Sequence, residues 1–110
     1  MIPTDVLDIV RGKLSDSEYQ RSDIYWHKGK FERGQNLKIG PLDWVMPFDA
    51  VLVFVDLAPK ANWAHPCLYV FIELHLSEVR ILKSSFPPPA PDWPGSYALL
   101  SKKGEPLQDH

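Results

Sequence analysis

The feature that most constrains the fold is a run of five consecutive apolar residues, Val51–Val55. Side chains of a β-strand point alternately to its two faces, so a strand that is apolar on both faces must be covered on both. The run therefore predicts a strand over residues 51–57 in the middle of a sheet.

The following stretches predict two more strands and an antiparallel meander. Residues 67–74 place four aliphatic side chains on one face, and residues 78–82 alternate in the same way. Apolar residues at helical spacing predict an N-terminal helix from Thr4 to Leu14, with Thr4 as its N-cap. Short strands are expected near residues 24–26, 37–39 and 97–100, and the segment 42–49 reads as irregular or as a short helical turn. The expected fold is α+β: an N-terminal helix packed on a mainly antiparallel sheet of four to six strands, with a Pro-rich C-terminal segment.

Length and composition describe an ordinary small globular protein. The 110 residues suffice for one domain, expected over residues 1–100 with a polar tail at 101–110. A single cysteine excludes an internal disulfide, and no apolar run approaches the ~20 residues of a membrane span. Without a signal-peptide pattern at the start, we expect a cytoplasmic protein with no membrane contact.

The loop that joins the two main strands carries the candidates for chemistry. Extended backbone through Pro66 would point His65 and Cys67 the same way. The imidazole could then activate the thiol, with Asp56 or Asn62 orienting the histidine. Alternatively, Cys67 is a small buried hydrophobe at the start of a strand. Because no thiol-enzyme signature is complete, we assign no catalytic residue.

Metal binding and acid–base chemistry are weaker alternatives in this sequence. His65 and Cys67 could be joined by His27, His75 or Asp56 as zinc ligands, but the chain lacks the second close pair typical of zinc sites. We expect no metal and no cofactor. Glu73 and His75 share a strand face and could form an acid–base pair, or simply mark where that face reaches water.

Residues 25–38 form a basic, aromatic segment. Between Arg21 and Lys38 the chain has five basic and two acidic residues. Such a segment can bind single-stranded nucleic acid by phosphate contact and base stacking, or it can be a solvated hairpin whose lysines discourage edge pairing. The net charge of −2 for the whole chain argues against a dedicated nucleic-acid protein.

Aromatic residues beside prolines favour a third class of function. Trp44, Trp63 and Trp93 lie in such contexts, and Phe86 precedes a Pro-rich stretch. Rigid aromatic side chains on stiff backbone are good interface anchors. The sequence therefore predicts a small non-enzymatic binding protein of the adaptor, accessory or immunity type, which acts through a protein partner. A Cys/His enzyme and a single-strand binder remain the alternatives.

Overall fold

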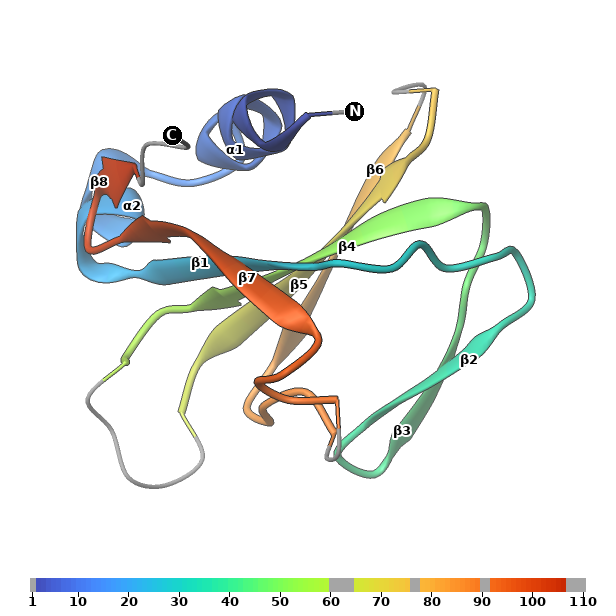
Figure 1. Cartoon of the computed structure of the whole chain (residues 1–110). Coiled ribbons are helices and arrows are strands. Elements are labelled where there is room, and N and C mark those ends of the chain that lie inside the picture. Colours follow the sequence, from blue (N-terminus) through green and yellow to red (C-terminus); the bar gives the residue numbers. More distant parts are fainter. Residues whose placement is uncertain (1, 60–64, 76–77, 90–91, 107–110) are drawn as a thin grey trace.

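The computed structural model describes residues 2–59, 65–75, 78–89 and 92–106 (Figure 1). Within these residues, two helices precede eight strands. Their bounds are α1 Pro3–Arg11, α2 Asp16–Arg21, β1 Asp23–His27, β2 Asn36–Ile39, β3 Leu42–Val45, β4 Ala50–Asp56, β5 Cys67–Glu73, β6 Val79–Ser84, β7 Tyr97–Lys102 and β8 Glu105–Pro106.

Six of the strands form one sheet in the order β6-β5-β4-β1-β7-β8, and β2 and β3 form a separate hairpin. Every pairing between these strands is antiparallel. The predicted α+β fold is confirmed, as are the meander β4-β5-β6 and the central position of β4 between β5 and β1.

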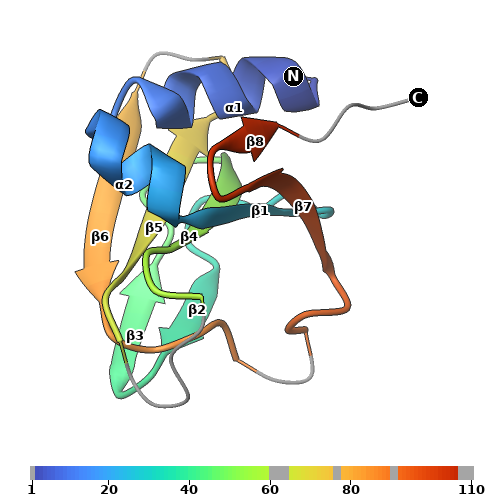
Figure 2. The same cartoon turned by 90° about the vertical axis from the view of Figure 1, so that its left-hand side faces the viewer.

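The two faces of the sheet are covered by different elements, which explains why β4 is apolar throughout. Val51, Val53 and Val55 belong to a core cluster that includes α1 residues. Leu52 and Phe54 belong to a second cluster that includes hairpin residues. Figures 1 and 2 accordingly place α1 on one side of the six-stranded sheet and the β2–β3 hairpin on the other.

The N-terminal helices differ from the prediction in their ends and their number. Ile2, not Thr4, occupies the N-cap of α1, and no side chain caps it. Proline is favoured in the first turn because its missing N–H would have no helical partner there, so the helix begins at Pro3, before the predicted cap. The unpredicted α2 begins with a capping box, in which Ser15 and Glu18 exchange side chain–backbone hydrogen bonds.

The segment 42–49, read from the sequence as irregular or helical, instead begins with strand β3. Gly40 adopts a positive φ of 57° at the β2–β3 turn, a conformation that glycine reaches without steric cost. Trp44 then points toward the large sheet and stacks on Phe71, with ring centroids 5.0 Å apart. The tertiary contact therefore fixes a strand that the local sequence pattern does not indicate.

The C-terminal region adds more structure than predicted. Strand β7 continues through Lys102, and β8 pairs with it over Glu105–Pro106. Residues 101–106 therefore belong to the sheet and do not form a tail. Ser101 is fully buried. Within the described ranges, neither helix is long and apolar enough to span a bilayer.

Candidate functional site

Cys67 begins β5 and lies inside the protein, with 2% of its surface exposed. Its Sγ donates a hydrogen bond to the carbonyl oxygen of Phe86 at 3.3 Å. Burial in apolar surroundings raises the pKa of the thiol to about 11. The group is therefore protonated at neutral pH, whereas a nucleophilic cysteine requires a depressed pKa.

His65 pairs with Asp56, as one version of the enzyme hypothesis requires. The imidazole Nε2 lies 2.7 Å from Asp56 Oδ1, and both side chains are largely buried. The same carboxylate oxygen accepts the backbone N–H of Ala58 at 3.0 Å. Asn62, the other proposed orienting residue, lies outside the described residues. The structure thus contains a histidine–carboxylate pair beside a thiol that burial keeps neutral.

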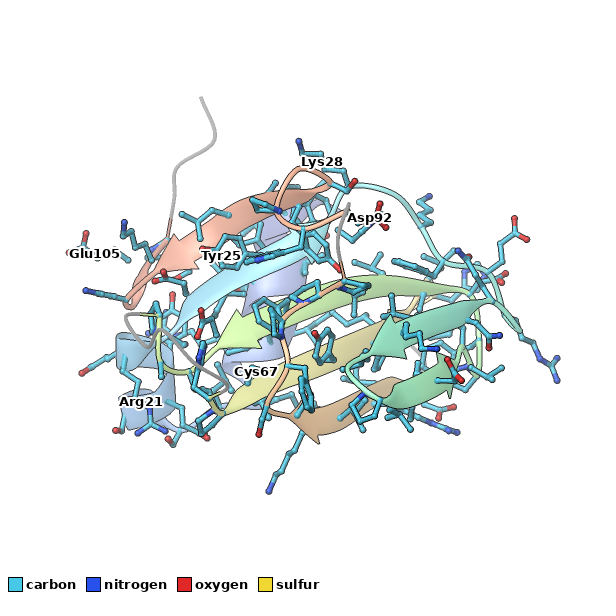
Figure 3. All side chains as sticks on the ribbon, turned by 90° about the horizontal axis from the view of Figure 1, so that it is seen from below. Arg21, Tyr25, Lys28, Cys67, Asp92 and Glu105 are labelled. Carbon is cyan, nitrogen blue, oxygen red and sulfur yellow. The ribbon has the colours of Figure 1, made fainter. Side chains whose placement is uncertain are left out.

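Strand register assembles a row of polar residues at this end of the sheet. Asp23 on β1 lies opposite Asp56 on β4, and Asp56 lies opposite Cys67 on β5. Residues directly opposite in an antiparallel pair point to the same face, about 4.5–5.5 Å apart. Figure 3 views this face, with Cys67 at the start of β5. Sequence reasoning missed Asp23 because its neighbour in the row is 33 positions away and only the register joins them.

The remaining candidate metal ligands lie at the opposite end of the sheet. His27 closes β1 and contacts the rings of Phe31 and Tyr97, while His75 follows the end of β5. Over the described ranges, no group of three or more histidine, cysteine, aspartate or glutamate residues could hold a metal ion. The geometry of these residues therefore gives the zinc hypothesis no support.

Glu73 and His75 lie near each other, but the contact is not between acid and base. The backbone N–H of His75 donates to the Glu73 carboxylate at 2.6 Å. Both residues line a surface pocket of about 260 Å³ together with Arg33 and Asp49. This arrangement matches the structural alternative, in which polar residues mark the end of a strand.

Two of the three predicted tryptophan anchors pack on the protein's own core. Trp44 stacks on Phe71. Trp93 contacts the rings of Tyr25, Phe54 and Tyr97, with ring centroids 4.8–5.2 Å apart. Trp63 lies outside the described residues. These contacts reduce the surface that Trp44 and Trp93 can offer a partner.

The basic segment likewise directs its rings inward. Phe31 is buried, and Tyr25 packs between Phe54 and Trp93. Lys28 donates to the carbonyl oxygen of Gly95 at 3.3 Å. Stacking of nucleic-acid bases needs accessible ring faces. The rings of Phe31 and Tyr25 instead pack against the protein's own core, so they offer little surface for base stacking.

Among the described residues, four large apolar side chains reach solvent on β3, on β6 and just after β6. Leu42 and Val45 on β3 are 43% and 55% exposed, Ile81 on β6 is 43% exposed, and Phe86 after β6 is 41% exposed. We call these four residues the edge surface. The fifth exposed large hydrophobic residue, Ile2, lies at the N-terminus. Only Phe86 was expected from the sequence, because exposure in β3 and β6 depends on which strands form the edges.

Comparison with protein-family models, with curated proteins and with solved structures gave no match to this chain.

Proposed function

We propose that this protein is a non-enzymatic binding protein of the adaptor, accessory or immunity type, which contacts a protein partner through the edge surface. The observation that carries the proposal is the exposure of four large apolar side chains on β3, β6 and the segment after β6. Large apolar side chains that a domain leaves exposed are candidates for burial by a partner.

Phe86 is held in place by contacts within the protein, which favours binding. The Phe86 carbonyl oxygen accepts hydrogen bonds from Cys67 and from the Tyr69 hydroxyl, the latter at 2.7 Å. Its ring lies so close to Gly40 that a Cβ there would approach the ring carbons to 2.4 Å. A side chain fixed before binding loses little conformational entropy when a partner contacts it.

The structure also changes which residues we propose as anchors. Phe86 keeps its predicted role, and Leu42, Val45 and Ile81 take the place of Trp44 and Trp93, whose rings are committed to the core. Trp63 remains a prediction from the sequence alone.

Charge substitution on the edge surface tests the proposal. The double variant Val45→Lys/Ile81→Lys places two charges where the partner would bury apolar area, and Ile2→Lys is the control at another exposed apolar position. We expect a partner that wild type and Ile2→Lys both capture from cells of the source organism, and that the double variant loses by at least about tenfold. Capture that is identical for all three proteins would refute the proposal.

The Cys/His enzyme remains the alternative favoured by one observation, the His65–Asp56 contact of 2.7 Å. It requires Cys67 to become accessible and ionised. Slow alkylation of Cys67 in the native protein would exclude this alternative.

A further inference from the structure

The pairing between β1 and β4 is interrupted where β1 ends. The register places Trp26 opposite Val53, and the next backbone pairing between the two segments is the bridge of Phe31 with Ala50. Four residues, 27–30, therefore stand opposite two, 51 and 52. Additional residues of this kind bend a strand away from its neighbour and are frequent beside functional sites. Figure 1 shows the resulting bend of the chain between β1 and β2.

A pocket of about 120 Å³ opens at this interruption, and we call it the basic pocket. Its apolar wall belongs to, or packs against, the core cluster on the helix side of the sheet, and consists of Trp26, Val51 and Leu74. The polar side chains that line it are all basic: His27, Lys28 and Lys30. The pocket therefore combines an apolar wall with a basic rim, and none of the residues recorded around it is acidic.

Hydrogen bonds within the protein hold the rim in place. The backbone N–H of Lys28 donates to the carbonyl oxygen of Ser96 at 2.8 Å, so the chain follows β7 where it leaves β4. The backbone N–H of Gly29 donates to Nδ1 of His27 at 2.9 Å and fixes the imidazole ring. The pocket is thus formed before a ligand enters, and little conformational entropy is lost on binding.

The two lysine charges of the rim have no carboxylate partner within the described residues. Lys30 is exposed. The ammonium of Lys28 donates one hydrogen bond, to the carbonyl oxygen of Gly95 at 3.3 Å, and an ammonium has three N–H donors. Asp92 lies 4.0 Å from Nε2 of His27 and does not line the pocket. Both lysines therefore keep donors for an anion.

We propose that the basic pocket binds the carboxylate of a small aliphatic acid. The lysine ammonium groups donate to the carboxylate, and such charge-assisted hydrogen bonds are stronger than neutral ones. The aliphatic body of the acid contacts the apolar wall and loses its exposure to water. Because an apolar cavity of about 150 Å³ holds benzene, a pocket of about 120 Å³ suits a body of about four carbon atoms. The proposal does not depend on the edge surface or on a protein partner.

Titration of the ¹⁵N-labelled protein at pH 7 tests this inference. The probes, at matched low ionic strength, are sodium butyrate, its neutral isostere butyramide, and sodium acetate. We expect butyrate to give saturable shifts of the indole N–H of Trp26 and of the backbone amides of residues 28–30. Butyramide should bind at least about fivefold more weakly because it lacks the charge. Acetate should also bind at least about fivefold more weakly, because two methylene groups lose their contact with the apolar wall.

Three results of this titration would overturn the proposal. Absence of saturable shifts at Trp26 and residues 28–30 would show that the pocket takes no such acid. Equal binding of butyrate and butyramide would show that the lysine charges do not contribute. Equal binding of butyrate and acetate would show that the apolar wall does not contribute. The titration uses the wild-type protein and needs no variant to fold.

Removal of one lysine charge sharpens the test. Lys30→Gln changes an exposed side chain of the rim, and Lys13→Gln removes the same charge at an exposed position that does not line the pocket. We expect Lys30→Gln to weaken butyrate binding at least about threefold, with an unchanged melting temperature, because a charge-assisted hydrogen bond is lost. Lys13→Gln should leave the binding unchanged. Unchanged butyrate binding in Lys30→Gln, or equal weakening in both variants, would contradict the proposal.

A carboxylate on a short aliphatic body occurs in free acids and at the C-terminus of a peptide that ends in an aliphatic residue. The dipeptide acetyl-Gly-Val with a free C-terminal carboxylate distinguishes these two sources. Binding of butyrate with no binding of the dipeptide supports a free acid as the ligand, because the pocket would then exclude a peptide backbone. Binding of the dipeptide at least as tight as that of butyrate supports a peptide C-terminus.

Discussion

The two faces of the six-stranded sheet are built from different chemistry. The face toward α1 is lined mainly by aliphatic side chains, with Tyr19 as its one buried aromatic residue among those described. The face toward the β2–β3 hairpin carries phenylalanine and tyrosine rings together with the thiol of Cys67. An aliphatic layer is held by packing alone, whereas the hairpin side also depends on ring geometry and polar contacts.

The polar candidates for chemistry lie on one side of the sheet. Asp23, Asp56 and Cys67 point to the hairpin side, and the Phe86 carbonyl closes over Cys67 from there. Substitutions on the two faces should therefore have different consequences.

The largest expected effect comes from the aromatic centre of the hairpin side. Phe54 is buried and its ring contacts those of Tyr25, Tyr69 and Trp93. We expect Phe54→Ala to lower the free energy of unfolding by about 3–5 kcal/mol, through lost burial and a cavity. The comparison on the helix side is Ile24→Val, expected to cost about 0.5–1.5 kcal/mol. Urea unfolding measures both. A cost for Phe54→Ala near that of Ile24→Val would show that the hairpin side is loosely packed.

The second effect concerns Cys67. Because its folded pKa is about 11 against an ordinary 9.0, its thiolate fraction at neutral pH should be about 100-fold below that of an unperturbed thiol. We expect iodoacetamide to modify the native protein at least about 100-fold more slowly than the urea-unfolded chain at the same pH. His65→Gln should not change the native rate, since His65 contacts Asp56. Rapid native alkylation near pH 7 that slows in His65→Gln would instead support the Cys/His enzyme.

The raised pKa of Cys67 also makes the stability of the protein depend on pH. The folded state holds the thiol proton more tightly than the unfolded chain, so this contribution to stability is complete below pH 9 and is lost as the pH rises toward 11. Cys67→Ala should therefore unfold with a weaker pH dependence between pH 9 and 11 than the wild type. An unchanged pH profile would mean that Cys67 titrates normally.

The third effect tests the contact that holds Phe86. Tyr69→Phe removes the hydroxyl that donates to the Phe86 carbonyl at 2.7 Å and leaves the ring in place. We expect a loss of about 0.5–1.5 kcal/mol in the free energy of unfolding, together with increased hydrogen exchange after β6. The matched control is Tyr19→Phe on the helix side, whose hydroxyl accepts only a long hydrogen bond of 3.5 Å from Ser101. Equal losses of unfolding free energy in both variants would mean that hydrogen bonds contribute no more to stability on the hairpin side than on the helix side.

The parts of this fold that the sequence predicts are those with a strong local pattern. Val51–Val55 and the alternation after Cys67 identify β4 and β5 because burial follows the two-residue period of a strand. The sequence does not indicate strand β3, because Leu42 and Val45 remain exposed and β3 is held by its pairing with β2 and by the stacking of Trp44 on Phe71. The short α2 depends on its capping box rather than on an apolar stripe.

The candidate sites were harder to predict because they depend on register and on strand order. The pairing of His65 with Asp56 follows from the loop that the sequence identified. The position of Asp23 opposite Asp56 follows from the pairing of β1 with β4, and no local sequence pattern indicates that pairing. The edge surface requires knowing that β6 ends the sheet.

The smallest expected effect separates folding from binding on the hairpin side. Val45 is 55% exposed and, by alternation, points away from the sheet on which Trp44 stacks. We expect Val45→Lys to change the free energy of unfolding by no more than about 0.5 kcal/mol, measured by urea denaturation. The inward-facing hairpin residue Leu37 is the comparison, and Leu37→Ala should cost about 2–5 kcal/mol. If Val45→Lys were as destabilising as Leu37→Ala, Val45 would be needed for stability. Loss of a partner in the double variant could then result from unfolding rather than from a lost contact. A neutral Val45→Lys leaves its apolar side chain without a role in stability, so binding is then the simplest reason for its exposure.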